Sequence, residues 1–337
     1  MRHRNLGKTG LQVSALGFGT GAIGGLFVRG DATEQRRAVA RALEAGITYF
    51  DTAPSYGDGR SEENLGRVLR DLDAWGRVVV GTKVRLEAGD LPNPHAAILR
   101  SLEGSLRRLG RGAVDLLHLH NPISGEGGAG AIETASGNAL NLDTVLGSVA
   151  EGMQQVVRRG LARHIGITGL GNAAALHAVV AAAGFETIQT YFNILNPSAG
   201  FAGASGGAQD FAGVIDKAAE AGMGVIAIRV MAAGAISARP ARHANAGDPG
   251  APLVSGAAYG RDLERARAFE LLATELGTAG PLELALRFAL AKPGVSTVLV
   301  GYSDLPQLED AIRWTERGPL SADVVRRLVD TARSVKP

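Results

Sequence analysis

Cysteine is absent from this chain of 337 residues, which excludes disulfide bonds, thiolate metal sites and cysteine nucleophiles. Aromatic residues make up only 5% of the sequence, and only five of its 35 basic residues are lysine. The formal net charge is +2, and because charges of both signs are interspersed along the chain, no nucleic-acid-binding surface is indicated. There is no apolar run of about 18 residues and no apolar stretch at the amino terminus, so we expect neither a membrane span nor a secretory signal. A cytoplasmic location is therefore expected.

What is present is an alternation of short apolar runs and longer amphipathic stretches. Residues 4–13 predict a β-hairpin around a glycine-bounded turn. Eight later runs are predicted as strands, at 15–19, 48–51, 78–84, 114–120, 164–168, 187–191, 224–228 and 297–300. Amphipathic helices are predicted at 34–45, 62–70, 94–109, 142–159, 173–183, 211–221, 263–290 with a break at 277–280, 305–315 and 321–335. Asp31 and Ser61 are predicted to cap the helices that follow them.

Strands that alternate with helices imply a parallel sheet, because parallel strands need crossover connections. Eight such units favour a (β/α)8 TIM barrel over an open sheet, here with an N-terminal β-hairpin and extra C-terminal helices. Since composition does not change along the chain, residues 1–337 are expected to form a single domain. Two long loops, 121–141 and 232–262, follow the fourth and seventh strands, and we expect them at the ligand-binding face, where barrel strands end.

Four titratable residues lie at or just after the ends of three successive predicted strands: Asp51, Tyr56, Lys83 and His120. A lysine in an apolar strand needs a partner, and Asp51 on the neighbouring strand is the natural one. The pKa of free tyrosine is about 10, which is too high for efficient proton transfer near neutral pH. An adjacent ammonium would favour the phenolate and lower this pKa, so Tyr56 beside Lys83 would be suited to exchange a proton with a carbonyl oxygen. His120 would hydrogen-bond to the same oxygen. Since no side chain donates hydride, this chemistry requires a nicotinamide or flavin cofactor.

Each of these residues also has a structural interpretation. Asp51 alone would be a helix cap or turn residue, Tyr56 a loop anchor, and Lys83 a side chain extending to the barrel rim. Their occurrence together on adjacent strand ends favours catalysis. A metal-dependent hydrolase with His118, His120 and Asp51 as ligands is a weaker alternative, because Lys83 would repel a cation. We therefore expect no metal site and place His118 in the packed core.

These residues lie in motifs that resemble the aldo-keto reductase superfamily over nearly the whole chain. The motifs are 6–14 with 16–20, 50–53 with 56–57 and 61–62, 82–83, and 120–122. The resemblance implies a barrel that binds NADP(H) or NAD(H), with Asp51, Tyr56, Lys83 and His120 as catalytic residues. Tyr56 would be the general acid in reduction and the base in oxidation. Residues 165–170 resemble most the branch of L-galactose and D-threo-aldose dehydrogenases.

The resemblance also implies which residues hold the cofactor. Thr168 supplies a hydroxyl where the family has serine, Gly169 replaces an asparagine, and Gln189 matches a glutamine that binds the nicotinamide carboxamide. Ile228 replaces an aromatic residue that stacks on the nicotinamide. Arg229 would meet the pyrophosphate, a polar substrate, or only a carboxylate at the rim. The residues expected at the cofactor are Gly19, Thr20, Asp51, Thr168, Gly169, Gln189, Ile228, Arg229, Val230, Met231, Gly301, Ser303, Gln307 and Asp310.

The segment 300–310 matches the family's adenosine-phosphate segment. Ser303 is predicted to cap the following helix, whose free N–H groups suit a phosphate. Residues 293–312 contain no lysine or arginine, Gln307 stands where arginine is usual, and Asp310 stands where an acid contacts the adenine. A 2′-phosphate would thereby lose charge-assisted hydrogen bonds of about 1.5–3 kcal/mol each, which weakens an NADP preference.

The choice between NAD and NADP stays open, because Arg239 and Arg242 in a long loop would reach a 2′-phosphate. The implied activity is an NAD(P)-dependent oxidoreductase that reduces an aldehyde or ketone, or oxidises a sugar or another alcohol. The polar loop 121–141 and the few aromatic residues favour a small polar carbonyl or hydroxyl substrate. The alternative is a cofactor-binding regulatory subunit resembling potassium-channel β subunits. The sequence does not indicate the oligomeric state or the reaction direction.

Overall fold

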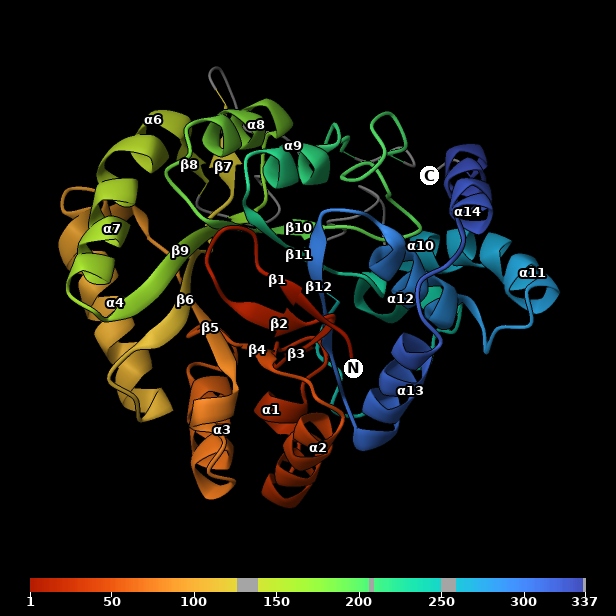
Figure 1. The fold of residues 1–337 in the computed structure, drawn as a ribbon, viewed down its shortest axis with the longest axis horizontal. Coiled ribbons are helices and arrows are strands. Elements are labelled where there is room, and N and C mark those ends of the chain that lie inside the picture. Colours follow the sequence, from red (N-terminus) through yellow and green to blue (C-terminus); the bar gives the residue numbers. More distant parts are fainter. Residues whose placement is uncertain (126–138, 206–208, 250–258, 336–337) are drawn as a thin grey trace.

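The computed structural model describes residues 1–125, 139–205, 209–249 and 259–335. Its centre is a closed barrel of parallel strands in the order β10-β11-β12-β3-β4-β5-β6-β9 (Figure 1). The strands are β3 (Leu16–Gly19), β4 (Tyr49–Asp51), β5 (Val79–Val84), β6 (Val114–Leu119), β9 (Ala162–Gly169), β10 (Thr187–Tyr191), β11 (Gly224–Ile228) and β12 (Val295–Gly301). Each predicted strand is present, and the predicted (β/α)8 barrel is confirmed.

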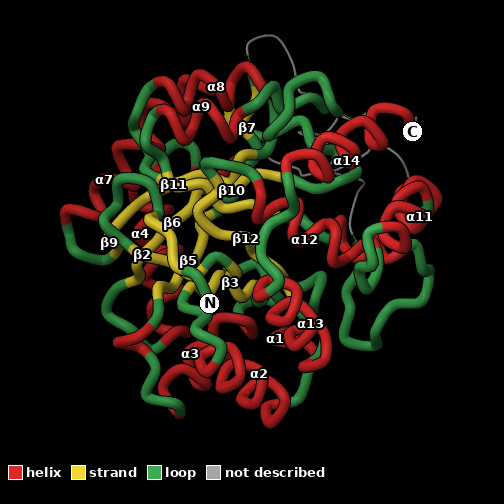
Figure 2. The backbone as a smooth tube through the Cα atoms, turned by 45° about the vertical axis from the view of Figure 1, so that its right-hand side comes forward, coloured by secondary structure: helices red, strands yellow, loops and turns green. Residues whose placement is uncertain are grey.

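Helices surround the barrel (Figure 2). They are α1 (Leu26–Arg29), α2 (Ala32–Glu44), α3 (Arg60–Asp71), α4 (Pro94–Leu109), α6 (Leu142–Thr144), α7 (Ala150–Arg158), α8 (Ala173–Ala181), α9 (Val214–Glu220), α10 (Tyr259–Ala266), α11 (Ala268–Glu275), α12 (Pro281–Ala291), α13 (Leu305–Glu316) and α14 (Ala322–Ser334). Short turns lie at η1 (Trp75–Arg77), η2 (Ala88–Asp90) and η4 (Ala232–Ser237), and a π-helical segment at η3 (Val145–Val149). Within the described residues, none of these helices has both the length and the apolar character that crossing a bilayer requires.

Three predicted helices differ in detail from those observed. The helix predicted at 142–159 is interrupted by the π-helical segment, where Gly147 leaves helical backbone angles. The helix predicted at 211–221 begins only at Val214, because Gly213 takes a left-handed conformation with φ 72°. The stretch 263–290 contains the predicted break before α12, but it has a second break at Arg267. Each of these boundaries depends on local backbone angles, which cannot be predicted from the periodicity of apolar residues.

The predicted hairpin is confirmed, and it closes the amino-terminal end of the barrel. Strands β1 (His3–Asn5) and β2 (Gln12–Ser14) pair antiparallel. Apolar side chains of the hairpin pack against residues inside the barrel in one cluster, which contains Leu6, Leu11, Val13, Tyr49, Val79, Leu116 and Ile226. Gly7 has φ 55°, and a Cβ there would lie 2.3 Å from the Gly224 nitrogen, so only glycine fits this close approach. With this end closed, the interior opens toward the carboxyl ends of the strands.

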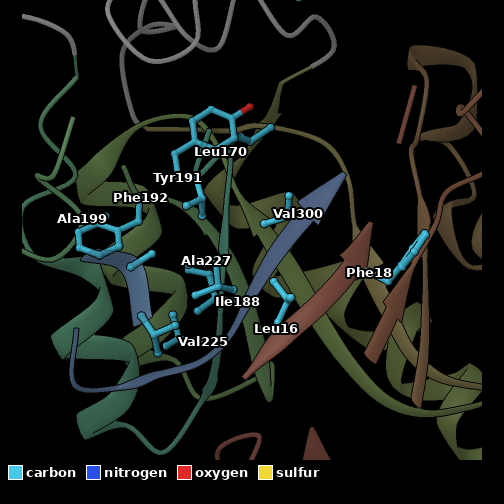
Figure 3. Close-up of a cluster of buried hydrophobic side chains, with 14 of the residues drawn as sticks. Leu16, Phe18, Leu170, Ile188, Tyr191, Phe192, Ala199, Val225, Ala227 and Val300 are labelled. Atoms are coloured by element: carbon cyan, nitrogen blue, oxygen red, sulfur yellow. The ribbon is translucent and has the colours of Figure 1, made fainter. Parts of the chain in front are cut away.

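Strand periodicity separates an apolar outer face from a more polar inner face. In β3, Leu16 and Phe18 are buried with Ile188, Val225 and other apolar side chains in the large cluster of which Figure 3 draws a part. Alternate positions point inward, and there the polar side chains lie near the strand ends. Because side chains alternate along a strand, the sequence pattern alone fixes which residues face the interior.

The two long loops are described in part. Residues 126–138 and 250–258 lie outside the described residues. In the first loop, β7 (Ile123–Ser124) and β8 (Leu140–Asn141) form a small parallel pair. In the second loop, η4 follows β11, and α10 already begins within the predicted loop.

Candidate active site

A buried ion pair joins β4 and β5 inside the barrel. Lys83 Nζ contacts Asp51 Oδ1 and donates to the Thr52 carbonyl oxygen at 2.8 Å, and all three residues are buried. Burial alone would lower the pKa of the Lys83 ammonium, but the charge of Asp51 and the contact with Tyr56 raise it above its usual value. Lys83 is therefore charged at neutral pH. The sequence had predicted this pairing across neighbouring strands.

The second oxygen of Asp51 is held by two further donors. The Tyr49 hydroxyl donates to Asp51 Oδ2 at 3.0 Å, and Gln189 Nε2 donates to the same oxygen at 2.6 Å. Burial, together with the Asp51 charge, raises the pKa of Tyr49 well above its usual value, so Tyr49 stays a protonated donor. On the adjacent strand, a Cβ at Gly81 would lie 3.0 Å from the Tyr49 hydroxyl, so the absence of a side chain there leaves room for this contact. The carboxylate is thus fixed in one orientation.

Tyr56 and His120 complete the predicted group of four. Lys83 Nζ lies 5.0 Å from the centroid of the Tyr56 ring, and the Tyr56 and His120 rings meet edge to face with centroids 5.9 Å apart. Burial, followed by the charges of Lys83 and Arg85 and by His118, lowers the pKa of His120 well below its usual value. His120 is therefore a neutral hydrogen-bonding group at physiological pH, although part of its ring faces a cavity.

Ser61 has a different position from the predicted one. Helix α3 begins before it, after Gly59 in a left-handed conformation with φ 88°, so Ser61 is not its cap. Instead the buried Ser61 hydroxyl lies 2.7 Å from Thr20 Oγ1 and 2.9 Å from Thr52 Oγ1. Thr20 Oγ1 donates in turn to the Asp51 carbonyl oxygen at 2.9 Å. These hydroxyls hold the backbone around Asp51 from behind the site.

A cavity of about 640 Å³ opens at the carboxyl ends of the strands. Most residues that the sequence assigned to catalysis or to the cofactor line it, namely Gly19, Asp51, Tyr56, His120, Thr168, Gln189, Ile228, Arg229, Val230, Met231, Gly301, Ser303, Gln307 and Asp310. Lys83 lies behind this wall against Asp51. Thr20 and Gly169, both predicted at the cofactor, do not belong to the lining. They are buried in the barrel wall.

The cavity wall carries polar atoms that suit an elongated polar ligand. Thr168 Oγ1, the Tyr302 hydroxyl and Trp314 Nε1 are buried and have no hydrogen-bond partner in the described part of the chain. All three residues line the cavity. Because buried polar atoms are nearly always hydrogen-bonded, these three indicate a ligand that supplies their partners. The same cavity extends from Tyr56 to Asp310 on α13, so its extent and these three polar atoms fit a dinucleotide.

Asp304, and not Ser303, caps α13. Its side chain accepts from the Gln307 backbone N–H at 2.9 Å. The Ser303 hydroxyl donates to the Gly24 carbonyl oxygen at 2.7 Å, and Gln307 Oε1 accepts from the Ser303 backbone N–H at 3.0 Å. The prediction that Ser303 caps this helix was therefore wrong. The side chains of residues 300–310 that line the cavity are neutral or acidic, as the sequence indicated.

Arg239 and Arg242, the two arginines predicted to reach a 2′-phosphate, differ in their position relative to the cavity. Arg242 lines the cavity, and its guanidinium donates to the Ala233 and Gly247 carbonyl oxygens at 2.6 Å each. It thereby holds together the chain segment that follows β11. Arg239 is exposed and does not belong to the cavity lining. Of the two arginines, Arg242 is therefore the one that faces the cavity.

Several lining residues were missed by the sequence interpretation. Arg85 and Tyr191 line the catalytic end of the cavity, and Trp314 on α13 lines the other end. Each of these residues could have been predicted from its spacing in the sequence. Arg85 lies two residues after Lys83 and Tyr191 two after Gln189, so each continues the inward face of its strand. Trp314 continues a helical stripe with Gln307, Asp310 and Ala311.

His118 lies deeper in the barrel than His120. It is completely buried, as predicted, and its Nε2 lies 3.0 Å from Thr187 Oγ1. Burial and the charge of Lys83 lower the pKa of His118 to about 3. Over residues 1–125, 139–205, 209–249 and 259–335 there is no group of three or more His, Asp or Glu side chains arranged to hold a metal ion.

Comparison with known protein families identifies the family to which this chain belongs. Residues 15–333 match the Aldo/keto reductase family. The chain belongs to that family. It is 27% identical to L-galactose dehydrogenase of Arabidopsis thaliana over 313 residues, which cover 92% of this chain and 86% of that protein. As a member of the family, the protein is an NAD(P)-dependent oxidoreductase.

The chain is also similar to a second curated protein over a shorter segment, and to a solved structure at lower sequence identity. A probable voltage-gated potassium channel subunit beta of Oryza sativa subsp. japonica is 38% identical over 128 residues, covering 36% of this chain and 38% of that protein. The solved structure of an aldo-keto reductase from Bacillus halodurans, in its holo form, superposes with a TM-score of 0.72 at 24% identity. That match covers 100% of this chain and 98% of the other. It supports the fold.

Proposed function

We propose that the protein transfers hydride between NAD(P)(H) and a small polar substrate, with Tyr56 as the general acid and base. The substrate is an aldehyde or ketone in reduction, and a sugar or another alcohol in oxidation. The observation that carries the proposal is the Lys83 ammonium, which Asp51 keeps charged 5.0 Å from the Tyr56 ring at the wall of the cavity. An ammonium at this position stabilises the negative charge that develops on the phenol oxygen as the proton leaves.

In reduction, the Tyr56 hydroxyl gives its proton to the substrate oxygen, and the electron pair of the O–H bond stays on the phenolate. Lys83 stabilises that phenolate by its charge. The neutral His120 donates an N–H to the same substrate oxygen and orients it. In oxidation, the phenolate accepts the alcohol proton, so the same residues serve both directions.

A bound nicotinamide supplies or accepts the hydride, and the residues of this chain hold and orient it. We propose Thr168 and Gln189 at the carboxamide, 228–231 along the ring and pyrophosphate, and 301–310 at the adenosine. The partnerless Thr168 hydroxyl supports the first assignment, and the buried donors of Tyr302 and Trp314 support a ligand at the far end. NAD(H) and NADP(H) both remain within the proposal. Gly19, Thr20 and Gly169 complete the proposed cofactor set.

The test follows the absorbance of the reduced nicotinamide with NADH and NADPH, and with NAD and NADP, against a panel of aldehydes, ketones and sugars. Turnover of at least one polar member by the wild type is the expected result. Absence of turnover with every pairing, in protein that binds the cofactor by fluorescence titration, would contradict the proposed reaction.

The alternative is a cofactor-binding regulatory subunit. It is favoured by the similarity to the rice channel subunit over 128 residues. Such a subunit would co-purify with a membrane protein and would bind cofactor without needing substrate turnover. Turnover in the panel that is lost in Tyr56→Phe favours the enzyme.

A further inference from the structure

Tyr49 lies one layer below Asp51 inside the barrel. It stands two residues earlier in β4, so both side chains point inward, and its ring packs with the hairpin side chains at the closed end. The side chain is completely buried and does not belong to the cavity lining. Its hydroxyl nevertheless donates to Asp51 Oδ2 at 3.0 Å. Tyr49 therefore contacts the catalytic carboxylate from behind the cavity wall.

Two glycines on the neighbouring strands make room for this side chain. A Cβ at Gly17 on β3 would lie 2.9 Å from Tyr49 Cδ1. A Cβ at Gly81 on β5 would lie 3.0 Å from the Tyr49 hydroxyl oxygen and 3.4 Å from Asp51 Oδ2. A side chain at either position would press on the ring or on the hydroxyl. The barrel wall on both sides of β4 is thus shaped around Tyr49.

The two oxygens of Asp51 have different partners. Oδ1 contacts the Lys83 ammonium, which lies 5.0 Å from the Tyr56 ring centroid, and Oδ2 accepts from Tyr49 and Gln189. Because a carboxylate is planar, the donors on Oδ2 also fix the direction in which Oδ1 faces the ammonium. Gln189 lines the cavity and is proposed to bind the nicotinamide, whereas Tyr49 does not belong to the lining. Tyr49 is thus the donor to Asp51 that a ligand in the cavity does not contact.

We propose that Tyr49 is a positioning residue for the proton transfer: its hydroxyl holds the Asp51 carboxylate, and through it the Lys83 ammonium, where the positive charge stabilises the Tyr56 phenolate. The inference rests on the proposed function and adds to it a residue behind the cavity wall. Displacement of the ammonium weakens this stabilisation, because the interaction of two charges depends on their distance. Tyr49 itself stays protonated, since burial and the Asp51 charge raise its pKa well above the usual value.

The first test is Tyr49→Phe, which removes the donor and leaves the ring. Cofactor-loaded protein is mixed with the polar substrate that the wild type turns over fastest, and the nicotinamide absorbance is followed through a single turnover. We expect the rate to fall at least about fivefold, because Asp51 Oδ2 keeps only the Gln189 donor. The cofactor Kd should stay within about twofold, since Tyr49 does not belong to the lining. A rate within about twofold of the wild type would overturn the proposal.

A second substitution, Gly81→Ala, separates the hydrogen bond from packing. Alone, its methyl group would press on the Tyr49 hydroxyl at 3.0 Å, so this variant should also be slow. In Tyr49→Phe/Gly81→Ala the methyl fills the space that the hydroxyl leaves, and it meets Asp51 Oδ2 at 3.4 Å and Leu116 Cβ at 3.5 Å, which are ordinary contacts. The double variant should recover the urea midpoint lost in Tyr49→Phe and keep the low rate of that variant. Recovery of the wild-type rate would assign Tyr49 to packing and overturn the proposal.

Ser14→Ala is the matched control, because it also removes a buried hydroxyl near the closed end of the barrel. The Ser14 hydroxyl donates to the Leu16 carbonyl oxygen at 2.6 Å. This variant should lower the urea midpoint and keep the single-turnover rate within about twofold of the wild type. An equal loss of rate in Ser14→Ala and Tyr49→Phe would assign the effect to destabilisation and overturn the proposal.

The same measurements separate the inference from the proposed function. A rate that is lost in Tyr56→Phe and unchanged in Tyr49→Phe overturns the inference alone. A wild type that binds cofactor and turns over no member of the panel contradicts the proposed function, and the inference with it.

Discussion

The side-chain amide of Gln189 donates a hydrogen bond to the carboxylate of Asp51, with 2.6 Å between Nε2 and Oδ2. This contact crosses the barrel interior from β10 to β4. It joins the residue proposed to hold the nicotinamide to the ion pair that prepares the proton donor. If Gln189 binds the nicotinamide as proposed, the same side chain also orients the Asp51 carboxylate.

Removal of the Gln189 amide should impair both catalysis and cofactor binding. In Gln189→Leu, Asp51 Oδ2 keeps only the Tyr49 donor, and a poorly satisfied buried carboxylate oxygen costs about 1–3 kcal/mol. We expect kcat to fall about tenfold and the cofactor Kd to rise, measured by steady-state kinetics and fluorescence titration. Gln155→Leu on the exposed face of α7 is the control. Unchanged kcat and Kd in Gln189→Leu would show that the contact has no role.

The Asp51–Lys83 pair should behave as one unit. Removing either partner leaves an unpaired buried charge, so Asp51→Asn and Lys83→Met should each lower the free energy of unfolding by about 3–5 kcal/mol. The double variant should lose clearly less than the sum of the two, because it leaves no isolated charge. Urea unfolding of the four proteins measures this coupling. Strictly additive losses would mean that the two groups do not stabilise one another.

The buried His118 should make the fold sensitive to acid. Its pKa is lowered from 6.5 to about 3, so the unfolded chain takes up a proton below about pH 6.5 that the folded chain refuses until about pH 3. Stability from this group is therefore complete above pH 6.5 and declines as the pH falls toward 3, by up to about 1.4 kcal/mol per pH unit.

Urea unfolding at a series of pH values between neutral and acid measures this slope. His118→Gln should show a shallower loss of stability with falling pH than the wild type, because glutamine does not titrate. His3→Gln, which changes an exposed histidine on the hairpin, should keep the wild-type slope. Equal slopes in His118→Gln and the wild type would place the acid sensitivity elsewhere.

The hydroxyl cluster behind the site should contribute to stability. Ser61→Ala removes the shared partner of Thr20 and Thr52 from a buried position, so the free energy of unfolding should fall by about 1–3 kcal/mol. Ser334→Ala, whose exposed hydroxyl bonds only to its own helix, should change it by less than about 0.5 kcal/mol. Equal small effects in both variants, measured by denaturant unfolding, would contradict a structural role for the cluster.

The sequence was sufficient for the barrel and for the meeting of the four catalytic candidates. Parallel strands bring their carboxyl ends to one face, and alternation fixes which side chains point inward, so Asp51, Lys83 and His120 had to converge. Tyr56 follows from the short loop after β4. The same alternation, extended by two residues, would also have placed Arg85 and Tyr191 in the cavity.

Features that depend on backbone angles were not predictable in this way. Whether Ser61 caps α3 or bonds inside the wall depends on the left-handed Gly59 before it, which moves the helix start. Ser303 loses the capping position because the next residue, Asp304, bonds to the α13 backbone. The contact from Gln189 to Asp51 crosses the barrel between strands far apart in sequence, and no local pattern records it.

The central claim is that Tyr56 exchanges the proton with the substrate, and the direct test is kcat of Tyr56→Phe at saturating cofactor and substrate, measured beside the cofactor Kd. The substitution removes one oxygen and leaves the ring beside Lys83 and His120. We predict that kcat falls by about 10²- to 10⁴-fold, the usual share of general acid–base catalysis, while Kd stays within about threefold of the wild type. A kcat within about tenfold of the wild type would contradict the account.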